Sequence, residues 1–216
     1  MSTEFDSKIL CTVPFYDQFY ATTIDLVLST GKSTSRWLDT GCGTGNLCAR
    51  ATGIFSGAEF ALSDPSEQML AVAKDKLKTN PNVSYKLADT QSLDYPNDYF
   101  DVITAIQCHH YLDKPGRVEA VANCFRMLKP GGIFVEFENI RAFSSEGNSI
   151  GLKRWQDYQI SMGRTVDEAA AHMRRFDHEY FPISVFDHVD LLRDTGFKTV
   201  EVLWASFMQA GFYAIK

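Results

Sequence analysis

Hydrophobic residues along this chain alternate between short continuous runs and helically spaced positions. The short runs are typical of buried strands and predict strands at 36–39, 59–63, 83–87, 100–106 and 133–137. Between these runs, apolar residues recur every three or four positions, as in the helix expected after Pro115. Strands that alternate with helices indicate a doubly wound α/β fold around a mostly parallel sheet.

The two ends and one internal segment depart from this alternation. Aromatic and aliphatic residues from Tyr16 to Val27 share one helical face, so we expect an N-terminal lid helix at about 13–30. The last two apolar runs, 199–207 and 212–216, are too close for a crossover helix and should form an antiparallel hairpin. Residues 141–178 are expected to form a helical insertion over the sheet, with a Ser/Gly/Asn-rich stretch before helices at 152–161 and 166–175.

Composition narrows the class of protein. With 216 residues, 45% of them hydrophobic, the chain is expected to fold as one domain spanning 1–216. Its net charge of −6 argues against broad nucleic-acid binding. No apolar run reaches the length of a membrane span and the polar start lacks a signal-peptide pattern, so we expect a cytoplasmic protein without a membrane partner. Five cysteines without a C-x-x-C pair argue against disulfides and structural zinc.

A glycine-rich turn follows the first predicted strand. Its glycines, Gly41, Gly43 and Gly45, allow a ligand to lie against main-chain N–H groups, with Cys42 between the first two. An NAD-binding fingerprint requires G-x-G-x-x-G, but the third glycine here comes one position early, which argues against a dehydrogenase. Asp39, two positions before the first glycine, suits a ligand that carries an ammonium group.

Two further carboxylates follow the next two strands. Asp64 lies 19 positions after Gly45, where it can accept hydrogen bonds from both hydroxyls of a ribose, while Ser66 is available to cap the following helix. Asp89, with the Thr90 backbone beside it, lies within reach of an adenine amino group, although an Asx turn is the alternative. These carboxylates indicate a ligand with an amine, a ribose and an adenine.

These motifs, in this order, resemble those of the class I S-adenosylmethionine (SAM)-dependent methyltransferases. The resemblance rests on residues 38–45, 63–70, 88–90, 100–110 and 126–132. It implies S-adenosyl-L-methionine as the cofactor and a seven-stranded sheet of order 3-2-1-4-5-7-6 with one antiparallel strand. It also implies cofactor contacts from Pro65, Met69 and Gln107.

The two ends of the chain are similar to the carboxy-SAM synthases. This similarity covers residues 13–16, 182–188 and the C-terminal segment, and it implies that Tyr16 helps to cover the cofactor. The chain departs from those enzymes in Gly43-Thr44-Gly45, which has the ordinary methyltransferase form.

The acceptor side offers two histidines directly after the fourth strand. An acceptor that loses a proton needs a base near neutrality, so His109 and His110 are the catalytic candidates, with a slight preference for His110. Neighbouring residues of an extended segment point to opposite sides, so we expect only one of them to face the pocket. For the same reason Cys108-His109-His110 should not converge on an ion, and no metal site is expected.

The predicted acceptor contacts come from three places. Glu136 and Glu138 share one face of the fifth strand, with a solvated or ion-paired strand end as the alternative to a role in the pocket. The insertion would roof the site, and its aromatic and basic residues would suit a small acidic or planar acceptor, although Trp155 and Tyr158 can equally be packing residues. The candidate acceptor contacts are Tyr20, Glu138, Arg141, Trp155 and Arg174, and the roof also contains His172, Arg175 and His178.

The sequence therefore predicts a SAM-dependent methyltransferase that acts on a small molecule by in-line displacement. The alternatives are a carboxy-SAM synthase-like enzyme and a SAM-binding regulatory or partner protein without turnover. The acceptor, its nucleophilic atom and the oligomeric state are left open.

Overall fold

The computed structural model describes residues 2–216, with side chains from residue 6 onward, and contains one twisted sheet. Its strands run in the order β3-β2-β1-β4-β5-β8-β7, and β8 lies antiparallel to both of its neighbours. This confirms the predicted sheet order. A two-residue strand, β6, which was not predicted, pairs with the end of β5. The strands are β1 (Arg36–Thr40), β2 (Glu59–Asp64), β3 (Val83–Leu87), β4 (Phe100–Ile106), β5 (Leu128–Arg141), β6 (Ile183–Ser184), β7 (Thr199–Ser206) and β8 (Gln209–Ile215).

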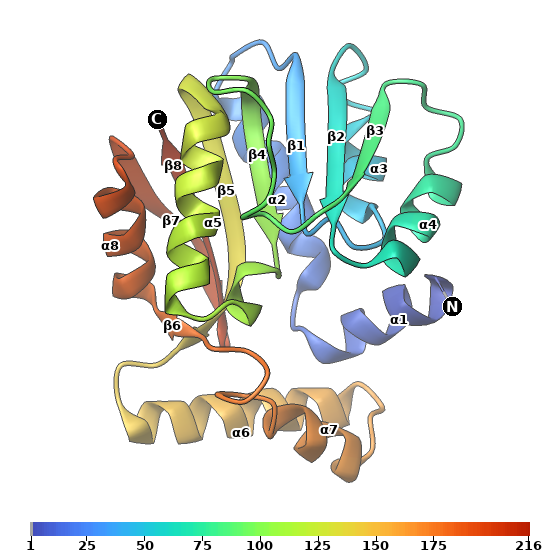
Figure 1. Cartoon of the computed structure of the whole chain (residues 1–216). Helices are drawn as coiled ribbons and strands as arrows, with labels where there is room; N and C mark the ends of the chain where they lie inside the picture. Colours follow the sequence, from blue (N-terminus) through green and yellow to red (C-terminus); the bar gives the residue numbers. More distant parts are fainter. Residues whose placement is uncertain (1) are drawn as a thin grey trace.

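Helices cover both faces of the sheet, as the alternating pattern predicts (Figure 1). On one face lie α2 (Tyr16–Ser29), α3 (Asn46–Ala51) and α4 (Glu67–Lys76), which pack around the buried Trp37 and Phe60. On the other face lie α5 (Lys114–Met127) and α8 (Val185–Thr195), which pack around Phe134 and Phe212. The result is a three-layer core that fixes the strand ends rigidly.

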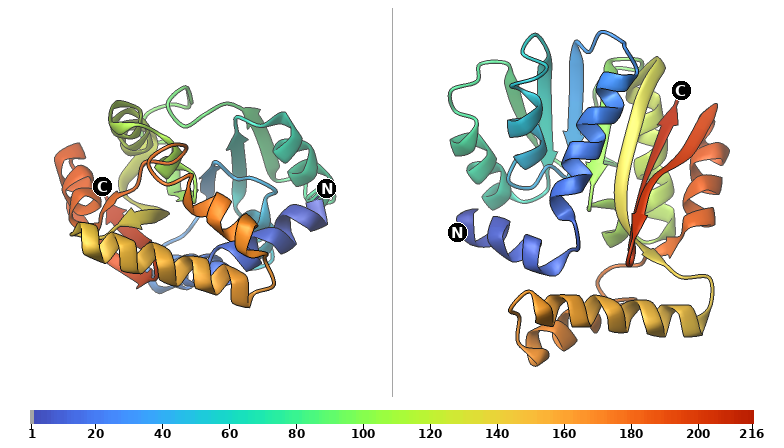
Figure 2. Two further views of the ribbon diagram at one scale, coloured as in Figure 1. Left: turned by 90° about the horizontal axis from the view of Figure 1, so that it is seen from below. Right: turned by 180° about the vertical axis from the view of Figure 1, so that it is seen from behind.

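The remaining three helices lie beyond the carboxyl ends of the parallel strands. They are α1 (Ser2–Thr12), α6 (Ser145–Ser161) and α7 (Val166–Met173). Figures 1 and 2 show α6 crossing below the sheet with α7 against it and α1 alongside. We call residues 2–12 and 142–182 the lid. In open α/β sheets ligands bind at the carboxyl ends of the strands, so the lid covers the expected binding edge.

Two predicted boundaries in the lid were wrong. Helix α1 was not predicted. The helix expected at about 13–30 is present as α2, which begins after Phe15, whose φ of 57° separates it from α1. It packs on a face of the sheet and not in the lid. Helix α6 begins at Ser145, within the stretch expected to be a loop, because the Ser144 side chain accepts a hydrogen bond from Gly147 N and caps it. A favourable N-cap outweighs the low helix propensity of this stretch.

The hairpin at the end of the chain positions the fifth strand. Strands β7 and β8 are separated by only two residues, and β8 pairs along β5 from Ile133 to Asn139. This pairing buries β5 on both edges, which places its polar residues Glu136 and Glu138 inside the protein. Among the described residues, no helix is long and apolar enough to cross a membrane.

Candidate active site

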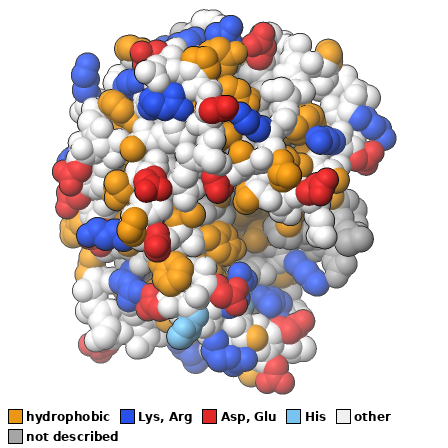
Figure 3. Space-filling view, viewed as in Figure 1, with side chains coloured by type: hydrophobic (Ala, Val, Ile, Leu, Met, Phe, Trp, Pro, Cys, Tyr) orange, Lys and Arg blue, Asp and Glu red, His pale blue; other side chains and the backbone are white. Residues whose placement is uncertain are grey.

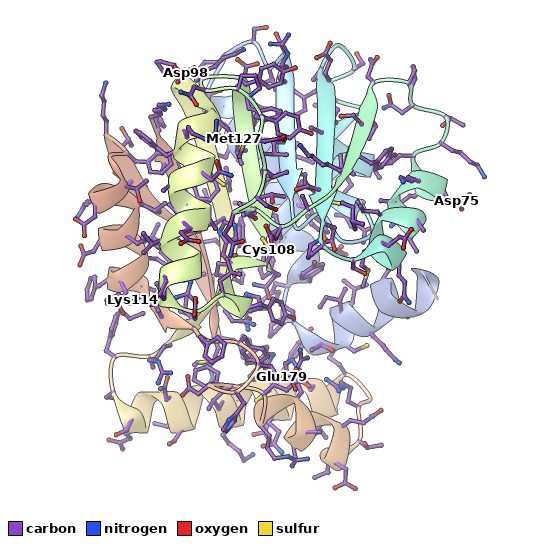
Figure 4. The ribbon with its side chains drawn as sticks, in the orientation of Figure 1. Asp75, Asp98, Cys108, Lys114, Met127 and Glu179 are labelled. Carbon is purple, nitrogen blue, oxygen red and sulfur yellow. The ribbon has the colours of Figure 1, made fainter. Side chains whose placement is uncertain are left out.

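A cavity of about 590 Å³ lies between the strand ends and the lid. This volume falls within the range that is usual for sites that bind small molecules and cofactors. Figure 4 marks Cys108 at the end of β4 on one side of this region and Glu179 on the lid segment opposite. Most of the predicted site residues line the cavity: Tyr16, Tyr20, Asp39, Gly41, Cys42, Gly43, Asp64, Pro65, Met69, Asp89, Thr90, Gln107, His109 and His110.

Five predicted site residues do not line the cavity. Gly45 is the buried N-cap of α3, and Glu138 lies behind His110. The tentative substrate roles of Trp155, Arg141 and Arg174 need correction. Trp155 is fully buried and donates its Nε1–H to Thr12 O (2.6 Å). It is therefore a packing residue of the lid, which the sequence analysis gave as the alternative to an acceptor contact.

The two arginines are turned away from the cavity. Arg141 pairs with Asp177 and donates to Pro182 O (3.3 Å), so it fastens the ends of the lid segment. Arg174 is exposed to solvent, whereas its neighbour Arg175 lines the cavity. Helical geometry points neighbouring residues in different directions, and the sequence did not fix the phase of α7.

The glycine turn comes close to the end of β4. A Cβ on Gly41 would lie 2.4 Å from Cys108 Cβ, so only glycine fits there without displacing the next strand. Gly43 has a φ of 54°, and a Cβ built on it meets nothing within 4 Å. Its N–H donates to Asp64 Oδ2 (2.9 Å), which joins the turn to the end of β2. The turn thus has the open, side-chain-free surface that a flat ligand needs.

Asp39 is almost fully buried beneath this turn. Its Oδ1 accepts a hydrogen bond from Thr104 Oγ1 (2.7 Å). Burial, reinforced by the charge of Asp64 and opposed by the Thr104 bond, raises the pKa of Asp39 to about 7. A buried carboxylate without a cation of its own is the partner that a ligand ammonium group requires.

Asp64 and Asp89 differ in how free their oxygens are. Asp64 accepts one backbone N–H on each oxygen, from Gly43 and from Ser66 (2.8 Å), and retains lone pairs for a diol. Ser66 caps α4, as predicted, by accepting from Met69 N (3.3 Å). Asp89 is exposed and its Oδ1 accepts from Ser92 N (2.9 Å), so the Asx-type turn that stood as its alternative is present.

Two tyrosines of α2 complete this side of the cavity. Tyr16 and Tyr20 are buried with their rings 5.2 Å apart in an edge-to-face arrangement. Burial raises the pKa of Tyr16 to about 12, with the charge of Asp39 adding to the shift, so its hydroxyl stays protonated. Both residues lie at the N-terminal end of α2, and they form the wall beside Asp39.

His110 is paired with a buried carboxylate at the cavity wall. Its Nδ1 hydrogen-bonds Glu138 Oε2, and the two Glu138 oxygens also accept the backbone N–H groups of His109 and His110 (2.9 Å each). Burial alone would raise the pKa of Glu138, but the charge and hydrogen bond of His110 outweigh it and lower that pKa. In the neutral form of His110, Nδ1–H is donated to Glu138, and the Nε2 lone pair can then accept a proton.

His109 forms a second buried chain of polar groups. Its Nε2 lies 3.1 Å from Thr90 Oγ1, its Nδ1 lies 3.8 Å from Glu136 Oε2, and Glu136 Oε1 bonds His188 Nδ1 (2.8 Å). Burial would raise the pKa of Glu136, but His188 and His109 lower it to about 2. Of the alternative considered for Glu136 and Glu138, the solvated strand end was wrong, since both are fully buried, whereas the ion-paired one agrees with their contacts to His188 and His110.

The expectation that only one histidine faces the pocket was also wrong. Residues His109–Tyr111 form a single 3-10 turn, so the alternation of an extended strand does not apply and both imidazoles line the cavity. The same turn brings the His109 imidazole next to the two carboxylates, whereas Cys108 contacts Glu138 through its backbone N–H (3.4 Å). The ligand atoms of His109, Glu136 and Glu138 lie within 4.8 Å of one another, a spacing that could hold an ion. Glu138 already accepts hydrogen bonds from the His110 imidazole and from the backbone N–H groups of His109 and His110. We therefore assign this cluster to hydrogen bonding and not to metal binding.

The sequence analysis missed several lining residues. They come from the lid and from the turns that face it: Lys8, Tyr111, Asn139, Arg164 and Tyr180. Tyr111 directly follows the histidine pair, and Asn139 follows Glu138, so their positions beside predicted site residues were a usable signal. Nothing in the local pattern of Lys8, Arg164 or Tyr180 marks them, since the lid packing alone brings them to the strand ends.

Comparison with known proteins agrees with this geometry. A methyltransferase domain model matches residues 38–132, which include the glycine turn, Asp64, Asp89 and both histidines. A ubiquinone/menaquinone biosynthesis C-methyltransferase of Pseudomonas paraeruginosa is 31% identical over 194 residues, or 86% of this chain and 68% of that protein. The chain belongs to the class I SAM-dependent methyltransferase family. It is an enzyme of that family, and its cofactor is S-adenosyl-L-methionine.

Two other proteins extend the comparison. A carboxy-S-adenosyl-L-methionine synthase of Campylobacter concisus is 26% identical over 219 residues, which cover 100% of this chain and 92% of that protein. Among solved structures, the N-methyltransferase NodS of Bradyrhizobium japonicum superposes with a TM-score of 0.67 at 16% identity, over 94% of this chain and 88% of NodS. NodS supports the methyltransferase fold, and at this identity it carries no information on the acceptor.

The residues in the cavity fit the methyltransferase cofactor. Asp64 and Asp89 suit its ribose and adenine. The buried Asp39 has no cationic partner among the described residues, and the ammonium group of the cofactor would be one. The open space at Gly43 leaves room for a ligand against the backbone.

Proposed function

We propose that this methyltransferase acts on a small-molecule acceptor that carries a dissociable proton, and that His110 is its general base. The observation that carries the proposal is the buried His110–Glu138 pair, whose imidazole lines the cavity. When bound, the cofactor supplies an electrophilic methyl group on a sulfonium.

The residues of this chain would then orient the acceptor and receive its proton. Glu138 holds the Nδ1–H of His110, so that Nε2 accepts the proton that the acceptor loses as its bond to the methyl group forms. The Tyr111 ring lies 4.5 Å from the His110 ring and shields it from bulk water on one side. The cavity of about 590 Å³ beneath the lid has the size of a small-molecule site, which supports a small acceptor.

The first experiment is an acceptor screen with a defined product. The purified protein is incubated with SAM and a panel of small hydroxyl, amine and acidic carbon compounds, and S-adenosylhomocysteine (SAH) and the methylated product are quantified by mass spectrometry. Equal amounts of both products, lost in His110→Asn, would support the proposal. SAH formation that is the same in His110→Asn would contradict the role of His110.

A carboxy-SAM synthase-like activity is the second candidate. It is favoured by the Campylobacter relative, which is similar to this chain along its entire length. The two functions differ in what happens to the cofactor, because carboxylation increases its mass, whereas methyl transfer releases SAH. Mass analysis of the nucleoside extracted from the purified protein therefore decides between them.

A further inference from the structure

The charged residues of the cavity are separated by sign. Its acidic lining residues all lie on the sheet side: Asp39, Asp64 and Asp89. Its lysine and arginine lining residues all lie on the lid side: Lys8, Arg164 and Arg175. Figure 3 shows Lys and Arg side chains below the hollow in this face of the molecule, with acidic side chains among them. The sheet side suits the positive groups of the cofactor, so the lid side calls for a negatively charged ligand.

Arg164 is held inside the lid by neutral groups only. Its Nη1 donates to Gln159 Oε1 and Thr12 Oγ1 (2.5 and 3.3 Å), and its Nη2 donates to Glu168 O (3.2 Å). It makes no ion pair with an acidic side chain in the described part of the chain. Its charge also acts on the Glu168 carboxylate, but no described carboxylate forms an ion pair with it.

Arg175 faces the same space from the end of α7. Its Nε donates to Glu179 Oε2 (2.7 Å), and no partner among the described residues engages its two terminal nitrogens. Its guanidinium lies 5.3 Å from the centre of the Tyr180 ring, which is itself 5.7 Å from the His110 ring. The Tyr180 ring therefore neighbours both the arginine and the proposed base.

Contacts through His172 connect the two arginines. Gln159 accepts from Arg164 and pairs with His172, the His172 carbonyl accepts from the Tyr180 hydroxyl, and the Tyr180 ring faces Arg175. His172 is buried, its Nδ1 pairs with Gln159 (2.9 Å), and its pKa falls to about 3 because of burial and the positive charges of Arg175 and Arg164. His172 is thus neutral, and the positive potential of the lid side comes from Arg164, Arg175 and Lys8.

We propose that Arg164 and Arg175 form an anion-binding subsite that holds the carboxylate or phosphate group of a small acceptor and directs the rest of that molecule toward His110. The proposal rests on the proposed function. A guanidinium presents paired N–H donors that match either anion, and in an enclosed wall such bonds are strong. The same chemistry could hold the carboxylate of the cofactor, and the test distinguishes these two sources.

The test uses small probes on the protein saturated with SAH. Benzoate, phenyl phosphate and the neutral benzamide are titrated by calorimetry into the wild-type protein, Arg175→Gln and Arg174→Gln. We expect either anion to bind the wild type about tenfold more tightly than benzamide, and Arg175→Gln to remove that preference. Arg174→Gln is the matched control, since Arg174 is exposed outside the cavity, and it should behave like the wild type.

Two further variants make the result specific. Glu179→Gln frees Arg175 from its ion pair and should strengthen benzoate binding several-fold. Arg164→Gln should weaken it as Arg175→Gln does, provided its unfolding midpoint matches that of the wild type. Equal binding of benzoate and benzamide, or unchanged benzoate binding in Arg175→Gln, would overturn the proposal.

The affinity for SAH identifies the source of the anion. If Arg175→Gln weakens SAH binding by the same factor as benzoate binding, the guanidinium holds the cofactor carboxylate and the acceptor subsite is overturned. If the wild-type protein fails to bind SAH, the proposed function fails and this proposal fails with it. SAH binding without any preference for anionic probes would overturn the anion subsite alone.

Discussion

At the scale of single residues, the site depends on buried charges whose partners differ. Among the described residues, the hydrogen-bond donor to the Asp39 carboxylate is the neutral Thr104, and the pKa of Asp39 is raised to about 7. Glu138 pairs with an imidazole, and its pKa is lowered. The two carboxylates therefore lose their charge in different pH ranges, Asp39 first as the pH falls. The Asp39 carboxylate can pair with a cationic ligand, whereas the Glu138 carboxylate already pairs with His110.

The raised pKa of Asp39 predicts a pH dependence of SAH binding. Asp39 must ionise to pair with an ammonium group, so affinity should fall about tenfold for each pH unit below about 7. It should fall again above about 8, where an α-amino group loses its proton. Calorimetric titrations from pH 5.5 to 9 measure this, and Asp39→Asn should bind weakly with no acid limb. An acid limb that persists in Asp39→Asn would assign it to another group.

The Glu138 carboxylate predicts a positioning effect on turnover. In Glu138→Gln the side chain can still accept a hydrogen bond from His110, but the charge that stabilises the imidazolium is lost. The acid limb of the rate profile should move to lower pH, and the maximal rate should fall by about tenfold, while His110→Asn should lose about 10² to 10⁴. SAH affinity should be unchanged in both variants, which a merely structural defect would not produce.

At the scale of elements, α1 is fastened on two sides. Asp6 accepts from Thr44 Oγ1 (2.7 Å), Asn46 Nδ2 (2.9 Å) and Lys76 Nζ (3.0 Å), all on the cofactor side. On the other side, Trp155 donates to Thr12 O (2.6 Å). These bonds hold α1 over the cavity, with the break at Phe15 separating it from the rigid core.

Weakening the first of these contacts should loosen the lid. Asp6→Asn removes the charge that pairs with Lys76, so we expect SAH to dissociate several-fold faster and amide exchange in residues 2–12 to increase. The unfolding free energy should change by less than about 1 kcal/mol, because the pair is partly exposed. Asp17→Asn removes the exposed pair between Asp17 of α2 and Arg50 of α3 and serves as the control. Equal dissociation rates in the two variants would show that α1 does not retain the ligand.

At the scale of the whole molecule, most of the fold could be predicted from the sequence because its pattern is local. The boundaries of β3 and β4 agree with the apolar runs, and the short final connection required an antiparallel β8. The lid was harder to predict, since α6 begins at a capped serine inside a polar stretch. On the cofactor side, the site residues lie in short consecutive motifs such as residues 39–45, which can be found in the sequence. The acceptor side joins Arg164, Tyr180 and His110 through tertiary packing, which no local pattern encodes.

The buried Glu136 links the acid stability of the molecule to one site. Its pKa falls from 4.5 to about 2 in the folded protein, so it stabilises the fold above pH 4.5 and this contribution is lost as pH falls toward 2. We expect Glu136→Gln to lower the unfolding free energy at pH 7 by on the order of 3 kcal/mol and to flatten its decline between pH 4.5 and 2. Urea unfolding across this range measures both effects.

An exposed glutamate provides the control for that measurement. Glu59 pairs with Arg36 at the surface, and Glu59→Gln should leave the unfolding free energy within about 0.5 kcal/mol of the wild type at every pH. If Glu136→Gln behaves in the same way, the buried His188–Glu136 pair contributes nothing to stability.

The pairing of β6 with the end of β5 bears on how such an enzyme can diversify. Ile140 and Arg141 lie opposite Ile183 and Ser184, so the chain leaves the sheet and returns to it at adjacent strands, about 5 Å apart. Everything between these points is lid, and the glycine turn, Asp39 and Asp64 all lie outside it. Evolution or an engineer could exchange this segment as one cassette, replacing acceptor recognition while inheriting the cofactor half intact.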